Sequence, residues 1–195
     1  DMLIPIHERL ILDLPIGEEF IFYDNIQQTL MDVAARVFIG LDELSPEAKR
    51  LGHLFSEINE GLITPLPYNL PFLQFRKSLK AREELRKFFI DNIPNRRGSD
   101  GLDMFTRYCN AKDEDGQYLN DIDIDGHIAF LLFAAFDTTT SALTNILYYL
   151  GKNPDWQDKV RNEIFDVKNK MPTFDDLAEM TLTEYVFQET LRFYP

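Results

Sequence analysis

Cysteine, tryptophan and long hydrophobic runs are scarce in this 195-residue chain, and each shortage excludes a class of protein. A single cysteine, Cys109, cannot form an internal disulfide, so a disulfide-stapled secreted scaffold is excluded and a reducing compartment fits. The longest apolar run, Ile128 to Phe136, is much shorter than the roughly 20 residues that span a bilayer. No basic segment with an apolar core marks a signal peptide near the N-terminus.

Positive charge is also in short supply. The chain has 33 acidic against 20 basic residues and a formal charge of −13, which argues against nucleic acid as the main partner. Most of the acidic excess indicates a soluble surface. One basic stretch lies between residues 76 and 97, interleaved with apolar residues at helical spacing. It predicts a solvated helix face, with a docking patch for an acidic partner as the alternative.

The hydrophobic pattern is helical almost throughout, and hydrophobic residues make up 45% of the chain. We therefore predict a mainly α fold, a helical bundle around one long central helix, in a single domain over residues 1–195. The expected helices are 25–39, 46–63, 72–92, 102–110, about 122–152, 154–168, a short turn at 173–179, and one from Thr183 to the end. Only residues 20–23 look like a strand.

Capping and breaking residues support these boundaries. Gly40 is a natural helix stop, and Ser45 followed by proline is a natural start. Three prolines break the chain in the loop 64–71. Asn120 or Asp121 can cap the central helix, and Thr183 can cap the last one.

An acid and four consecutive hydroxyl residues follow directly after the apolar run of the central helix, at residues 137–141. Buried polar groups need partners, and Thr or Ser can bond back to the carbonyl four residues earlier. Such bonding often bends a helix, and we expect a widened turn beside small Ala134 and Ala135 that leaves room for a ligand. The alternative is a helix whose hydroxyls simply satisfy themselves.

A second motif lies near the C-terminal end. Glu189 and Arg192 are three residues apart, so both lie on one helical face and an ion pair is expected. The spacing alone is weak, because such pairs are common on surface helices. Its surroundings, residues 153–164 and 180–195, strengthen the pattern.

The two motifs in this order resemble the cytochrome P450 family. The family's central-helix signature, a small-residue pair followed by an acid and two hydroxyls, matches Ala134, Ala135, Phe136, Asp137, Thr138 and Thr139, with Ala135 where Gly is usual. The resemblance implies that Ala134, Ala135, Thr138 and Thr139 pack over haem. It also implies that Thr138 organises a water and Asp137 relays protons from solvent, while Glu189 and Arg192 form a structural lock.

The resemblance further implies a haem-dependent monooxygenase that uses O2, an electron-donor redox protein and an apolar small molecule. The family's haem-ligating cysteine loop is not found, and Cys109 lacks its glycines, so we expect a buried free thiol instead. We therefore expect an internal piece of a P450, without the family's early part and cysteine loop. Two alternatives stay open: a haem-free helical protein that binds a hydrophobic ligand or a partner, and one chain of a split P450.

Three further groups of residues suggest possible binding sites. Phe130, Phe133 and Phe136 suggest an apolar substrate pocket, with ordinary helix packing as the alternative. The acids at 121, 123 and 125 imitate half of a calcium loop but lack its final Glu, so helix capping is favoured. The three histidines have no zinc spacing, and we expect no metal ligand in this chain. A cytoplasmic, bacterial-type protein is favoured, and this segment gives no sign of a membrane.

Overall fold

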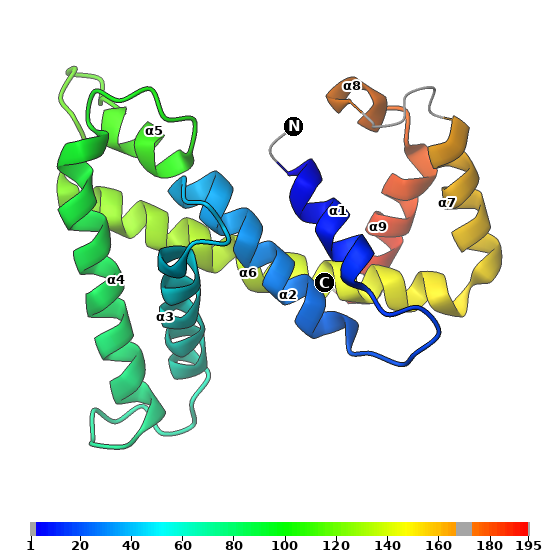
Figure 1. The fold of residues 1–195 in the computed structure, drawn as a ribbon, viewed down its shortest axis with the longest axis horizontal. Helices are drawn as coiled ribbons and strands as arrows, with labels where there is room; N and C mark the ends of the chain where they lie inside the picture. Colours follow the sequence, from blue (N-terminus) through cyan, green and yellow to red (C-terminus); the bar gives the residue numbers. More distant parts are fainter. Residues whose placement is uncertain (1–2, 167–172, 195) are drawn as a thin grey trace. The chain divides into compact units, whose positions relative to one another are not determined.

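The computed structural model describes residues 3–166 and 173–194, and Figure 1 shows them as helices joined by loops. Extended pairing within these residues is limited to one isolated bridge, between Lys112 and Tyr118. The mainly α prediction is therefore confirmed. The helices are α1 (Ile4–Asp13), α2 (Phe22–Ala34) with a π-helical turn (Ala35–Ile39), α3 (Pro46–Leu62), α4 (Gln74–Arg96), α5 (Met104–Asn110), α6 (Asp121–Lys152), α7 (Pro154–Asp166), α8 (Phe174–Leu177) and α9 (Thr181–Phe193).

The chain divides into two compact units. Unit 1 comprises residues 1–20 and 27–137, and unit 2 comprises residues 21–26 and 138–195. The central helix α6 contributes its first half to unit 1 and its second half to unit 2.

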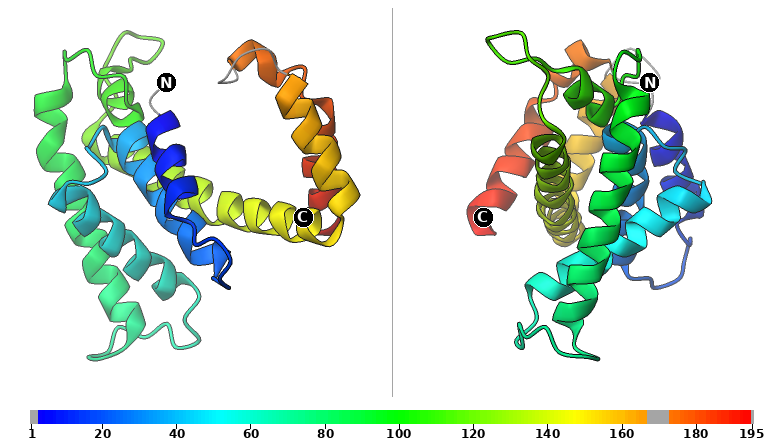
Figure 2. Two further views of the ribbon diagram at one scale, coloured as in Figure 1. Left: turned by 45° about the vertical axis from the view of Figure 1, so that its right-hand side comes forward. Right: turned by 90° about the vertical axis from the view of Figure 1, so that its left-hand side faces the viewer.

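Unit 1 is built around α3 and α4, which run antiparallel side by side (Figures 1 and 2). The two helices approach closely at Gly61, where a Cβ atom would lie 2.0 Å from the Ser78 hydroxyl oxygen. Apolar side chains from α3, α4, α5 and the first half of α6 form one buried core. Among its largest fully buried side chains are Leu85, Phe89, Phe105 and Ile128.

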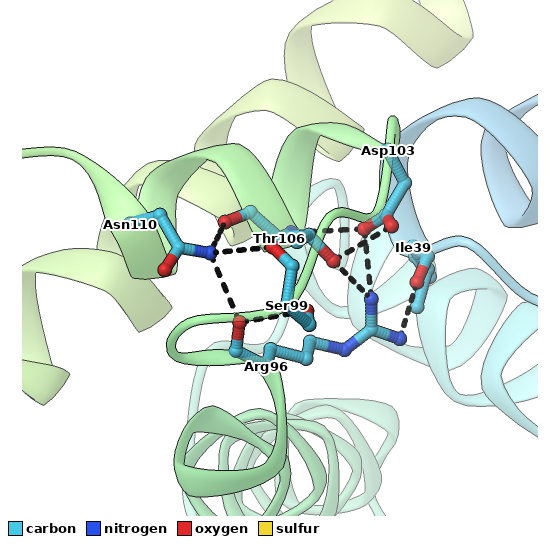
Figure 3. Close-up of polar contacts among 6 residues, drawn as sticks. All are labelled: Ile39, Arg96, Ser99, Asp103, Thr106 and Asn110. Carbon is cyan, nitrogen blue, oxygen red and sulfur yellow. Dashed lines mark hydrogen bonds and ion pairs between the residues drawn. The ribbon is translucent and has the colours of Figure 1, made fainter.

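A buried polar network joins α4, α5 and the π-helical turn (Figure 3). The Arg96 guanidinium donates to Asp103 Oδ1 at 2.8 Å, to Thr106 Oγ1 at 2.9 Å and to the Ile39 carbonyl at 2.6 Å. It also lies over the Phe105 ring, 4.6 Å from the centroid. One cation on α4 thus satisfies acceptors from two other segments, the start of α5 and the π-helical turn, which precedes Arg96 by 57 residues.

A second ion pair joins α4 to the start of α6. Arg82 donates to both carboxylate oxygens of Asp125, at 3.0 and 2.6 Å, and the Asp125 side chain is only 4% exposed. Asp125 is one of the three acids that imitate half of a calcium loop, and its role here is to pair with arginine. The Asn120 side chain caps α6 by accepting from the Asp123 amide at 2.9 Å, one of the two caps predicted.

Unit 2 contains the second half of α6 followed by α7, α8 and α9. α7 and α9 pack against each other, as Figures 1 and 2 show. The short helix α8 begins with a reciprocal cap, in which Thr173 and Asp176 each accept a bond from the other's backbone amide. The predicted end of the preceding helix at residue 168 lies outside the described residues, and so does Pro195.

Several predicted boundaries were wrong. Residues 20–23 form no strand: α2 already begins at Phe22, with Asp24 in the first turn, where negative charge is favourable. Phe72 has a φ of +72° and therefore stands outside α4. α4 instead continues through Pro94, and the turn around it is closed by a bond from the Arg97 amide to the Ile93 carbonyl. Gly40, at φ +73°, does end its helix as expected.

Candidate functional site

The middle of α6 presents two different faces. Ile124, Ile128, Leu132 and Phe136 recur every four residues and are buried in the core of unit 1. Asp137 and Thr138 are exposed, and so is Thr139. The apolar stripe fixes the rotation of the helix, so the acid and the first hydroxyls of the motif point away from that core.

The three candidate pocket phenylalanines do not share a face. Phe130 and Phe133 are 69% and 44% exposed, on the same side of the helix as Asp137 by helical spacing. Phe136 is 6% exposed and packs edge-on against Phe55, with ring centroids 5.4 Å apart. Ordinary helix packing, the alternative interpretation, therefore describes Phe136, and the exposed pair remains available for a ligand.

The small residues of the motif line up with the hydroxyls. Ala134 and Ala135 are half-buried, and Thr138 and Thr139 follow them four residues later, on the same side of the helix. A helix face of this kind leaves room for a flat group to approach the backbone.

The hydroxyl run does not distort the helix. Residues 121–152 are α-helical throughout, so the widened turn expected beside Ala134 and Ala135 is absent. The π-helical turn of unit 1 lies at 35–39 instead. Thr140 is fully buried, and its carbonyl accepts a bond from the Thr144 hydroxyl at 2.7 Å. A hydroxyl outside the motif thus makes one of the expected back-bonds without bending the helix.

Glu189 and Arg192 form the expected pair on α9. Arg192 Nε and Nη2 donate to the two carboxylate oxygens of Glu189, both at 2.7 Å. These bonds lower the pKa of Glu189 and raise that of Arg192. Both side chains are more than half exposed, so the pair is accessible to further partners.

The pair borders an open groove of about 720 Å³ within unit 2. Aromatic side chains from three helices line it: Tyr149 at the end of α6, Trp156 on α7, and Tyr185 and Phe193 on α9. The Arg192 guanidinium lies 4.2 Å from the centroid of the Phe193 ring. The groove is therefore a polar and aromatic surface with a preformed ion pair at its edge.

Sequence reasoning missed Glu163 on α7. Its carboxylate accepts bonds from the Leu182 amide at 2.6 Å, the Thr183 amide at 2.9 Å and the Thr183 hydroxyl at 2.7 Å. Thr183, predicted as the cap of the last helix, lies inside α9 and donates its hydroxyl. No local sequence signal predicted this contact, because Glu163 lies 20 residues from Thr183.

The one cysteine of the chain does not have the setting of a metal ligand. Cys109 is fully buried in the unit 1 core, and burial raises the pKa of its thiol to about 11, so the thiolate that ligates metal is disfavoured. No cluster of three or more His, Cys, Asp or Glu able to hold a metal occurs among the residues described. Cys109 is therefore poorly placed to supply the thiolate that haem iron would need.

One membrane feature concerns the same helix. α6 is long and apolar enough to cross a bilayer by length and composition, with a mean hydropathy of 1.3 over an 18-residue window. The core helix of a soluble protein passes the same criterion, so the observation is weak.

Comparisons with known proteins identify the family of this chain. The family profile described as Cytochrome P450 matches residues 21–195. A protein named putative cytochrome P450 136 from Mycobacterium tuberculosis is 30% identical over 89% of this chain and 36% of its own length. Abscisic acid 8'-hydroxylase 2 from Arabidopsis thaliana is 36% identical over 87% of this chain and 36% of its own.

The fold comparison covers nearly the whole chain. The solved structure of retinoic acid bound cyanobacterial CYP120A1 matches with a TM-score of 0.86 at 27% identity, over 97% of this chain and 44% of that one. The chain thus spans between a third and a half of the length of these relatives. Because sequence profile, relatives and fold agree across both units, the chain belongs to the cytochrome P450 family.

Proposed function

We propose that this chain forms the oxygen-activation helix and the Glu-x-x-Arg helix of a haem-dependent monooxygenase. The reaction would insert oxygen from O2 into an apolar small molecule, with electrons from a redox protein. Family membership supports this, as do relatives named abscisic acid 8'-hydroxylase 2 and beta-amyrin 6-beta-monooxygenase. The observation that carries the proposal is the exposed α6 face, where Thr138 follows small Ala134 and lies beside exposed Asp137.

Asp137 and Thr138 have complementary roles in the proposal. The Asp137 carboxyl reaches solvent and can exchange protons with it, and the adjacent exposed Thr138 hydroxyl can hydrogen-bond to a water. Haem, when bound, supplies the oxygen-activating chemistry. The residues of the α6 motif would contribute proton handling and shape.

The remaining residues shape the site. Ala134, Ala135 and Thr139 leave a shallow surface for a flat cofactor, and exposed Phe130 and Phe133 offer apolar contacts for substrate. Phe136 supports them from within the core, where it packs against Phe55.

The pair Glu189 and Arg192 is proposed as a structural lock. Arg192 keeps one terminal nitrogen, Nη1, outside its two bonds to Glu189. That nitrogen can engage a further acceptor and so tie α9 to another part of the enzyme.

The proton-handling roles are tested in a form that contains both this segment and a thiolate-bearing portion. We expect Thr138→Ala to keep electron consumption while it lowers product formed per electron pair about tenfold or more. Asp137→Asn is expected to slow turnover and enlarge the solvent isotope effect. Ser141→Ala removes an exposed hydroxyl one turn from Asp137 and is the matched control.

Unchanged coupling in Thr138→Ala would refute the proton-handling role. Haem binding is read from the reduced carbon monoxide difference spectrum. If no thiolate-bearing portion gives a spectrum with a thiolate signature, the haem-free ligand-binding alternative is favoured. Reconstitution of activity only after addition of a separate chain would favour a split enzyme.

The relatives come from both bacteria and plants. A cytoplasmic location is therefore also a proposal, and cell fractionation tests it.

A further inference from the structure

The helix that carries Glu189 and Arg192 has no cap of its own. Met180 occupies the N-cap position of α9, and its side chain makes no capping bond. The first amides of a helix have no partner within the helix and need acceptors from elsewhere. Here the acceptor comes from a different helix, because Glu163 on α7 receives the amides of both Leu182 and Thr183.

Three bonds define the start of α9 more tightly than an ordinary cap does. The two Glu163 oxygens each accept a backbone amide, and Oε2 also accepts the Thr183 hydroxyl. A carboxylate at a helix N-terminus additionally interacts favourably with the helix dipole. Two amides and one side chain together fix both the axial position and the rotation of α9 relative to α7.

We propose that Glu163 is a positioning residue, which sets where α9 begins and thereby holds the Glu189–Arg192 pair at the edge of the aromatic groove. Glu189 follows Thr183 by six residues, about 9 Å along a helix. A rotation of the first turn is carried along the rigid helix to the pair. Only the consequence for the enzyme rests on the proposed function, because the placement of α9 is a property of the chain itself.

Charge near Glu163 defines the expected pH behaviour. The other titratable groups that line the adjoining groove are Lys159 and Asp166 on α7 and Glu179 before α9. Partial burial raises the pKa of Glu163, but the bonds from Leu182 and Thr183 outweigh it, so its pKa lies below the usual Glu value. The capped arrangement is therefore complete above the unfolded-state pKa and is lost as pH falls through the lowered folded value.

The experiment measures amide hydrogen exchange and Trp156 fluorescence in the 195-residue chain. Trp156 is the only tryptophan and lines the groove together with Tyr185 and Phe193. We expect Glu163→Gln to lower the protection of the Leu182 and Thr183 amides about tenfold and to shift the Trp156 emission. Wild type should show the same changes on acidification, and the variant should lose that pH dependence.

Three further variants complete the design. Glu179→Gln removes one charge from the same groove. Within the part of the chain that the structure describes, Glu179 accepts bonds from α9 through its backbone carbonyl rather than its carboxylate, so protection should change less than about twofold. Thr183→Val removes one of the three bonds and should give an intermediate loss. Glu163→Asp keeps the charge but shortens the side chain, and restoration of the pH dependence without full protection is expected.

Equal effects of Glu163→Gln and Glu179→Gln would overturn the proposal, and so would full protection at Leu182 and Thr183 without the carboxylate. If Glu163→Gln prevents folding, Thr183→Val decides alone: unchanged protection and emission would overturn the proposal. None of these measurements involves haem or turnover. Failure of the monooxygenase proposal and failure of the Glu163 proposal are therefore distinguishable.

Discussion

Removal of the Arg96 side chain should destabilise unit 1 far more than removal of any exposed cation on the same helix. The Arg96 and Asp103 side chains are 17% and 9% exposed, so both charges are largely withdrawn from water. In Arg96→Met the Asp103 carboxylate keeps only the Thr106 amide and hydroxyl, and the Ile39 carbonyl loses the guanidinium that donates to it.

The magnitude follows from what is left behind. Breaking a buried ion pair by removal of one partner costs about 3–5 kcal/mol. Two retained bonds to Asp103 reduce this, and an orphaned carbonyl adds about 1–3 kcal/mol. We therefore expect Arg96→Met to lower the unfolding free energy of unit 1 by about 3–4 kcal/mol.

The assay is urea unfolding monitored by amide hydrogen exchange at Leu85 and Phe89. These two buried core residues of α4 report the unfolding of unit 1 specifically. Lys87→Met, an exposed change on α4, is the control and should stay within about 0.5 kcal/mol. A double-mutant cycle with Asp103→Asn should recover part of the loss. A loss below about 1 kcal/mol, or one equal to that of Lys87→Met, would refute the reasoning.

Other outcomes follow from single contacts. The Cys109 thiol, with its pKa raised to about 11, should resist alkylation at neutral pH in the folded chain and react on unfolding; rapid labelling of native protein would contradict this. Carboxyl NMR should show that the pKa of Glu189 lies below the usual Glu value. Its pairing with Arg192 then persists at neutral pH and is lost as pH falls through that lowered pKa. Arg192→Met should raise the pKa of Glu189 back toward the usual value. Gly61→Ala should lower the free energy of unfolding by about 1–3 kcal/mol, because its Cβ would meet a serine on α4. Gly126→Ala lies in open space and should be neutral or stabilising. Equal effects of the two substitutions would be inconsistent with close α3–α4 packing.

The sequence predicted those parts of the fold that depend on neighbours along the chain. Ser45 accepts the Ala48 amide at 3.1 Å, as a local cap should, and Gly40 adopts the left-handed conformation that ends a helix. The ion pair of Glu189 and Arg192 likewise needs only a three-residue spacing. These features are encoded within one turn, so the pattern was sufficient.

The failures concern partners distant in sequence. Thr183 satisfied every local rule for a cap, but Glu163, twenty residues earlier, performs that function. Asp125 looked like a capping acid, yet it is buried against Arg82, which lies 43 residues away. Both results depend on how helices pack, and single-sequence propensity contains no information about which helix an acid will meet.

The fate of Phe136 shows how one helix can serve two purposes. A period of 3.6 residues places Phe136 in line with Ile128 and Leu132, so the stripe that anchors α6 in the core of unit 1 determines which residues remain outside. Asp137 and Thr138 are exposed because the preceding residue, Phe136, packs into the core.

Truncation of Phe136 to Ala should therefore act on Asp137 and Thr138 indirectly, because loss of the Phe55 contact frees the rotation of α6. It also leaves a cavity that lowers the free energy of unfolding by about 3–5 kcal/mol. In contrast, Phe133→Ala removes a side chain that is 44% exposed and should leave stability nearly unchanged. If both truncations destabilised unit 1 equally, the division of α6 into a packed face and an exposed face would be wrong.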